Sequence, residues 1–175
     1  MQNAKADDYG VKADEARLLP AYCKPIIPAN LQHLARGSYH APPGFFHGQH
    51  FCHGLKFMIR AQRAIGDKKL RDYRLQQAVG EFSYVVNANE GSPVYLAYTR
   101  IQRAKAYEMG GKLDLALRDL ADAVRIAPKF PLAYGKLSDL YLKLGKTEEA
   151  KSVLQAGLKR NPNAKLLKQR LIKLR

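Results

Sequence analysis

The chain has 175 residues, of which 46% are hydrophobic and 26% are charged. This length allows one domain with a sizeable core, and no apolar run is long enough for a membrane span, which argues against an integral membrane protein. Lys and Arg outnumber Asp and Glu by 30 to 15, and the excess is strongest at the C-terminus.

The first 46 residues form a segment that differs in composition from the rest of the chain. Five prolines divide it into pieces too short for long helices, and its large apolar residues are too numerous for a disordered tail. The prolines are Pro20, Pro25, Pro28, Pro42 and Pro43. We predict that residues 1–46 are an irregular, proline-rich arm that packs on residues 47–175, with a concave groove of that domain as one place where it would fit.

The two cysteines of the chain lie on either side of the end of this arm, at Cys23 and Cys52. A disulfide between them would close a loop of about 30 residues and stabilise the fold by roughly 3–4 kcal/mol. The alternative is a pair of buried free thiols in a cytoplasmic protein. We predict the disulfide, and with it a periplasmic or secreted location. Because residues 1–15 show no export signal, this location requires a signal peptide that has already been removed.

Histidines are concentrated directly after the arm, at His47, His50 and His53. On a helix these residues advance by threes, so two or three of them could reach one metal ion. Neither Cys-x-x-Cys nor a haem-attachment motif is present. Polar packing between the arm and the helix is the favoured interpretation, so we predict no metal and no other cofactor, with metal binding kept as an alternative function.

Two long helices are predicted next, over about 48–65 and 70–88, because apolar residues recur there three and four positions apart. Compared with the spacing of a regular repeat, the stretch from Asp67 to Arg74 is longer than a repeat turn permits. We interpret the pair as a degenerate hairpin that caps the helices that follow.

The second half of the chain contains two stretches that repeat each other at an offset of 34 residues. The matching pairs are Tyr107 and Tyr141, Gly111 and Gly145, Ala116 and Ala150, Leu120 and Leu154, and Pro128 and Pro162. Each stretch predicts two amphipathic helices joined at the glycine and ended by the proline. A period of this length is typical of stacked helical repeats.

These positions resemble the tetratricopeptide repeat family. The second stretch follows the family pattern throughout, with Tyr134, Leu137, Ser138, Tyr141, Gly145, Ala150, Leu154, Gly157 and Pro162. The first departs from it at Arg100 and Arg103, which suggests an irregular neighbour upstream. The resemblance implies an all-α, right-handed array of antiparallel helix pairs, with regular repeats at 97–130 and 131–164 and a capping helix over 163–174.

In this family, ligands usually bind the concave face formed by the first helix of each repeat. That face corresponds here to Tyr98, Ile101, Lys105, Glu108, Leu132, Asp139 and Leu142. The lysine-asparagine clamp with which some members hold a C-terminal carboxylate is not reproduced, so capture of a peptide terminus is not expected.

The C-terminal segment is strongly basic, since the seven charged residues from Lys159 onward are all Lys or Arg. This favours an anionic partner, whether an acidic protein or peptide, nucleic acid, polysaccharide or lipid headgroups, while a solvated end cap is the alternative. Nucleic acid is disfavoured because no nucleic-acid-binding motif accompanies the charge.

No nucleophile with a base, phosphate-binding loop or pair of acids indicates an enzyme. We therefore predict a non-enzymatic adaptor or scaffold that binds another protein, in an exported bacterial assembly such as pilus, secretion or polysaccharide machinery. The alternatives are a cytoplasmic three-repeat chaperone of secretion substrates and a metal-binding protein that uses the histidine cluster.

Overall fold

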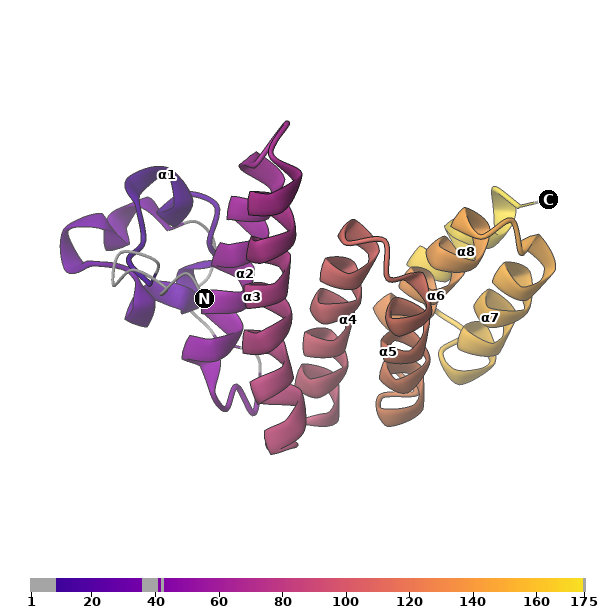
Figure 1. The fold of residues 1–175 in the computed structure, drawn as a ribbon. Coiled ribbons are helices and arrows are strands. Elements are labelled where there is room, and N and C mark those ends of the chain that lie inside the picture. Colours follow the sequence, from indigo (N-terminus) through magenta and orange to yellow (C-terminus); the bar gives the residue numbers. More distant parts are fainter. Residues whose placement is uncertain (1–8, 36–40, 42, 175) are drawn as a thin grey trace. The chain divides into compact units, whose positions relative to one another are not determined.

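The chain divides between Gly91 and Ser92 into two units in the computed structural model, which describes residues 9–35, 41 and 43–174. This division falls inside the segment 47–175 that the sequence predicts as one repeat domain, and that domain assignment stays a prediction. Every regular element in the described residues is helical, which confirms the predicted all-α class (Figure 1). None of these helices combines the length and the hydropathy that a membrane span requires.

Two long helices form the body of the first unit, α2 (Gly48–Arg63) and α3 (Lys68–Ala88), which pack side by side (Figure 1). The second helix begins at Lys68, two residues before the predicted start, because the side chain of Asp67 accepts a hydrogen bond from the backbone N–H of Leu70 and caps α3. The helices approach closely at Gly54, where an added Cβ would lie 2.5 Å from the ring of Phe82.

The described part of the arm consists of short pieces, as its prolines predict. These are α1 (Ala13–Ala16) and two 3₁₀ helices, η2 (Ala21–Ile26) and η3 (Ala29–Leu34). Proline supplies the residue before each 3₁₀ helix, and η2 packs against α2. Leu19 and Ile27 are buried, so the arm contributes to the core of its unit. His40 and Pro42 lie outside the described residues.

Covalent and ionic links join the arm to α2. Cys23 and Cys52 are joined in the structure, with their Cα atoms 5.5 Å apart. Arg60 donates from Nε to Oε1 of Glu15 at 2.5 Å and from Nη2 to Oε2 at 3.0 Å, and Arg63 pairs with Asp14. Burial raises the pKa of Glu15, but hydrogen bonds from Arg60 and from a backbone N–H outweigh burial and lower that pKa overall.

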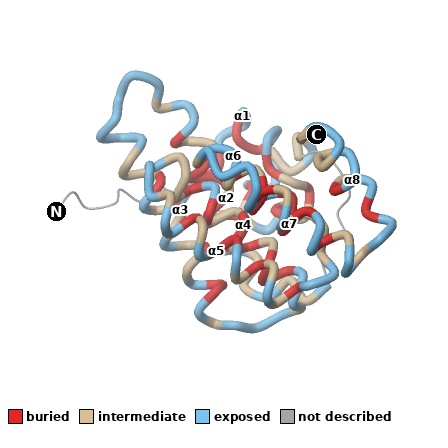
Figure 2. Tube along the Cα trace, turned by 90° about the vertical axis from the view of Figure 1, so that its right-hand side faces the viewer, coloured by how far each residue is buried: buried red, intermediate tan, exposed pale blue. Residues whose placement is uncertain are grey.

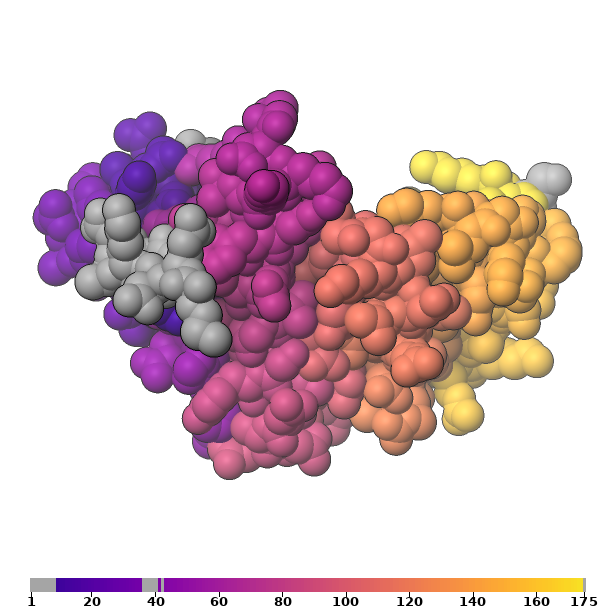
Figure 3. Space-filling view, in the orientation of Figure 1, coloured from indigo at the N-terminus to yellow at the C-terminus, as the bar shows by residue number. Residues whose placement is uncertain are grey.

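The second unit is an array of five helices. They are α4 (Pro93–Met109), α5 (Leu113–Ile126), α6 (Pro131–Lys143), α7 (Thr147–Arg160) and α8 (Lys165–Ile172). Helices α4 and α5 form one pair, α6 and α7 form the next, and α8 packs on α6 and α7; Figure 3 shows the yellow residues of α8 against the orange residues before them. The turns of the two pairs are also alike: Gly111 and Gly145 stand at equivalent positions and have φ angles of 73° and 74°.

Small buried residues allow the helices of this unit to approach one another. Ala104, Ala116, Ser138 and Ala150 are all buried, and large residues such as Leu120 and Leu154 fill the space between them. The two kinds of position recur at the same places in both repeats. In Figure 2 the buried stretches, in red, alternate along the helices with exposed stretches, in pale blue, as expected of amphipathic helices.

The structure gives a reason for Arg100 and Arg103 that differs from the irregular neighbour suggested by the sequence. Arg103 donates to both carboxylate oxygens of Asp119 in α5, at 2.7 and 2.6 Å, and Arg100 donates to Oδ1 of the same residue at 3.2 Å. Asp119 is buried, so it requires such partners. An ion cluster inside the repeat therefore replaces the apolar residues of the family pattern.

Candidate peptide-binding groove

The second unit contains a hollow of about 480 Å³ between its first helices. Residues of α4 and α6 form its walls, together with one residue of α5: Tyr98, Ile101, Gln102, Lys105, Glu108, Leu120, Leu132, Lys136 and Asp139. The structure thus brings together six of the seven residues that the sequence placed on the concave face. We refer to this hollow as the groove.

The floor of the groove is apolar. Ile101 and Leu120 are buried, and Leu132 is partly buried in the adjoining core cluster. These side chains face inward because the helices present one apolar stripe to their neighbours, and the groove lies where the stripes of α4 and α6 meet. An apolar side chain of a ligand would lose water contact here and be stabilised by about 25 cal/mol per Å² of surface buried.

The rim of the groove is charged, and its two acids already have cationic partners. Lys143 lies 3.7 Å from Glu108, and Arg170 donates to both carboxylate oxygens of Asp139, from Nε at 3.0 Å and from Nη2 at 2.9 Å. Lys136 lies 3.8 Å from the same Asp139. Lys105 is exposed and makes no ion pair within the part of the chain that the structure describes.

Helix α8 supplies Arg170, which holds Asp139 from outside the groove. Leu167 is fully buried against the second repeat and anchors α8, which places Arg170 three residues later beside Gly135 of α6. A Cβ on Gly135 would lie 3.3 Å from Nε of Arg170, so the absence of a side chain there leaves room for the guanidinium. Hydrogen bonds to Asp139 raise the pKa of Arg170 against the effect of its partial burial.

Sequence reasoning and the structure differ at the edges of the groove. Leu142 does not line it, because it lies beyond Asp139 on α6 and is exposed to solvent. Gln102 and Lys136 line it and were missed, although each stands one helical turn after a predicted groove residue, a spacing that puts both on the same helix face. Arg170 could not be found in this way because it comes from a separate helix.

The histidines proposed as weak metal candidates point to different neighbours. His50 contacts Oε2 of Glu81 through Nδ1 at 2.8 Å and stacks on the ring of Tyr84, with centroids 3.9 Å apart. His47 contacts Oε2 of Glu90 through Nε2 at 3.1 Å. These contacts link α2 to the end of α3.

The third histidine, His53, instead accepts a hydrogen bond at Nδ1 from Lys56 at 3.2 Å and meets the ring of Tyr9 edge-on. Burial lowers the pKa of His53 to about 4, and the charge of Lys56 acts in the same direction. Within the described residues, no three His, Cys, Asp or Glu side chains are grouped so as to hold a metal ion.

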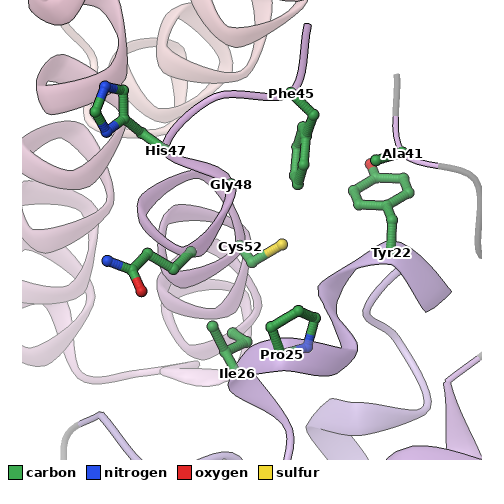
Figure 4. Close-up of a pocket in the computed structure, with 9 residues that line it drawn as sticks. Tyr22, Pro25, Ile26, Ala41, Phe45, His47, Gly48 and Cys52 are labelled. Carbon is green, nitrogen blue, oxygen red and sulfur yellow. The ribbon is translucent and has the colours of Figure 1, made fainter. Parts of the chain in front are cut away.

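A second hollow, of about 710 Å³, lies in the first unit between the arm and the start of α2 (Figure 4). Tyr22, Pro25 and Ile26 of η2 line it together with Phe45, and the rings of Tyr22 and Phe45 meet at 5.2 Å. Figure 4 shows the ring of His47 pointing away from this space. The hollow is thus mainly apolar and results from the packing of the arm on α2.

Comparisons with known proteins agree with the repeat geometry. The sequence profile described as "Tetratricopeptide repeat" matches residues 109–171, which run from the end of α4 to α8. The chain contains tetratricopeptide repeats. The repeat family suggested by the 34-residue offset is therefore confirmed.

Curated relatives share the repeats over about the same length of chain. The chain is 30% identical over 109 residues to small glutamine-rich tetratricopeptide repeat-containing protein 2 of Mycosarcoma maydis, covering 62% of this chain and 30% of that protein. It is 30% identical over 110 residues to DnaJ homolog subfamily C member 3 of Homo sapiens, covering 63% of this chain and 21% of that protein. The chain thus spans less than a third of the length of either relative.

A solved structure supports the arrangement of the helices. The crystal structure of a thermophilic tetratricopeptide repeat protein of Thermus thermophilus matches with a TM-score of 0.62 and 23% identity, covering 74% of this chain and 63% of that one. At this identity the likeness concerns the fold.

Proposed function

We propose that the protein is a non-enzymatic adaptor whose groove binds a segment of another protein. The observation that carries this proposal is a hollow with an apolar floor and a charged rim, built from the first helices of consecutive tetratricopeptide repeats. Helical repeats present extended concave surfaces because each unit is rotated slightly against the last, and such surfaces suit an extended or helical peptide. The proposal needs no reactive group, only shape and charge.

Selection of peptides on the intact protein tests this proposal. A phage-displayed peptide library is selected on the immobilised full chain, and the dissociation constants of enriched peptides are measured by fluorescence polarisation. We expect the substitution Gln102→Trp to weaken binding by about tenfold or more, because Gln102 lines the groove and an indole there would fill it. Thermal melting of the variant checks that the fold is intact.

Leu142→Asp is the matched control, since Leu142 is exposed on α6 outside the groove. The enriched peptides should bind this variant with dissociation constants within about twofold of those for wild type. A set of enriched peptides that bind Gln102→Trp as tightly as wild type would overturn the groove as the binding site.

We further propose that this adaptor works in an oxidising compartment, as part of an exported assembly such as bacterial pilus, secretion or polysaccharide machinery. Support comes from the pairing of Cys23 with Cys52, which ties an arm with little regular structure to α2. Thiols trapped by alkylation in the producing cells, followed by mass measurement, test this location. The expected result is two unmodified cysteines and a mass about two hydrogens lower than that of the reduced chain. Two alkylated cysteines would instead favour the cytoplasmic chaperone alternative.

A further inference from the structure

We propose that the segment bound in the groove is acidic, carries an apolar side chain, and is held through its side-chain carboxylates. This inference rests on the proposed function and adds the chemistry of the partner. It follows from three features of the groove: the compensation of its acids, the position of its lysines and the apolar floor between them.

The acids of the groove do not present their charge to a ligand. Asp139 is held by two hydrogen bonds from Arg170, and Glu108 lies 3.7 Å from Lys143; neither Arg170 nor Lys143 lines the groove. Cations from outside the groove therefore neutralise the negative charges inside it. What remains for a ligand is the charge of the groove's own lysines.

Those lysines stand on the two helices that form the walls. Lys105 is exposed on α4 and Lys136 is exposed on α6. Among the described residues, the ion-pair contact of Lys136 is with Asp139 at 3.8 Å, and this carboxylate is already bound on both oxygens by Arg170. Carboxylates of a ligand would thus find a cation on each wall, and a charged hydrogen bond at a partly desolvated site is stronger than one between neutral groups.

The floor distinguishes a polypeptide from other anions. Ile101, Leu120 and Leu132 form an apolar surface between the lysines, which an aliphatic or aromatic side chain would cover. Nucleic acid is usually bound by rows of cations along successive phosphates. The groove instead offers cations on either side of an apolar floor. An acidic segment with an apolar residue between its carboxylates fits this arrangement.

Peptides selected on the intact protein provide the probe. The probe set comprises the enriched peptides that lose binding to Gln102→Trp, because these occupy the groove. We expect them to be rich in Asp and Glu around an apolar residue, and to bind about tenfold more weakly when their acids are replaced by Asn and Gln. Amidation of the peptide C-terminus should leave the dissociation constant unchanged, because side-chain carboxylates make the contacts.

Charge reversal of single lysines in the protein tests which of them contact the acids of the peptide. Lys105→Glu and Lys136→Glu should each weaken the binding of these peptides by about fivefold or more. The dissociation constant of each variant should also depend less on salt than that of wild type. Lys129→Glu is the control: Lys129 is exposed in the loop between α5 and α6, outside the groove, and the change in net charge is the same. This variant should bind within about twofold of wild type.

The outcomes separate this inference from the proposal on which it rests. Groove-bound peptides that are neutral or basic, or that tolerate Lys105→Glu and Lys136→Glu, would overturn the acidic partner and leave the adaptor function standing. Displacement of the peptides by a short oligodeoxythymidine at similar concentration would also overturn it, in favour of nucleic acid. If no enriched peptide responds to Gln102→Trp, the adaptor proposal itself fails.

Discussion

The two units of this chain reach stability by different routes. In the second unit, small and large apolar residues recur at the same places in consecutive repeats, and each helix packs mainly on its neighbours in sequence. In the first unit, α2 and α3 form a single hairpin, and an arm of short pieces is attached to it by a disulfide and by ion pairs between residues far apart in the chain.

This difference shows what a repeat provides. A repeated unit needs only the contacts that its neighbour also makes, so a local pattern specifies both the helix and its packing. An arm without long helices buries little backbone in regular hydrogen bonds and has to be held by links whose partners are distant in sequence. This comparison therefore predicts that a substitution in one unit changes the stability of that unit and leaves the other unchanged.

The largest expected effect is that of removing the disulfide. Replacing Cys23 and Cys52 by Ser should lower the free energy of unfolding of the first unit by roughly 3–4 kcal/mol, because the loop between them is then unconstrained in the unfolded chain. Hydrogen exchange should show faster exchange of α2 amides and unchanged exchange in α6 and α7. Equal loss of protection in both units would contradict the comparison.

A core truncation in the second unit should have the opposite distribution. Leu154 is fully buried, and Leu154→Ala should cost about 3 kcal/mol through lost burial and the cavity that remains. Protection of α6 and α7 amides should fall while that of α2 is unchanged. Leu115→Ala is the matched control, since Leu115 is exposed on α5 and its truncation should change stability by less than about 0.5 kcal/mol.

The stability of the first unit should fall as the pH is lowered from about 6.5 to about 4.5. His53 has a pKa of about 4 in the folded state and 6.5 in the unfolded state, so over this range the unfolded state binds more protons. Burial is the main cause, with Lys56, His50 and Arg60 as the charged groups that act on the ring. Because His53 is partly exposed, we expect a loss of about 1–2 kcal/mol rather than the full value of the shift.

Urea denaturation at a series of pH values measures this effect, and His53→Gln should flatten the curve over the same range. The titration of Glu15 adds to this loss only near the lower limit of the range. Its lowered pKa means that it contributes stability above its ordinary value of 4.5, and that this contribution is lost as the pH falls further. An unchanged pH profile in His53→Gln would exclude His53 as the cause.

The smallest expected effect is a gain in the second unit. The hydroxyl of Ser138 is buried without a hydrogen-bond partner among the described residues, so Ser138→Ala should raise the free energy of unfolding by about 1 kcal/mol. Thermal melting measures the gain. A larger residue at this close-packed position, as in Ser138→Val, should instead destabilise the unit. A loss of stability in Ser138→Ala would show that the hydroxyl has a role in packing.

Sequence reasoning succeeded where the structure depends on neighbours along the chain. The repeat offset predicted the glycine turns at Gly111 and Gly145 and the small residues at the helix contacts. The family resemblance pointed to seven concave-face residues, six of which line one hollow. The resemblance also placed Leu142 on this face, but the hollow ends before it on α6. It did not find the partner of Arg100 and Arg103, because Asp119 lies on the next helix and a charged pair leaves no periodic signal.

The amino-acid sequence by itself therefore determined the helices of the second unit and their pairing, because the spacing of apolar and small residues specifies both. The face that forms the groove followed from the resemblance to the repeat family. The tertiary structure alone decided the electrostatic character of that groove. Asp139 is an acid in the sequence, but Arg170 reaches it from α8, 31 residues further along the chain, and neutralises it. The sign of the charge offered to a partner is thus a property of the packed helices, since it depends on which cations the fold brings to each carboxylate.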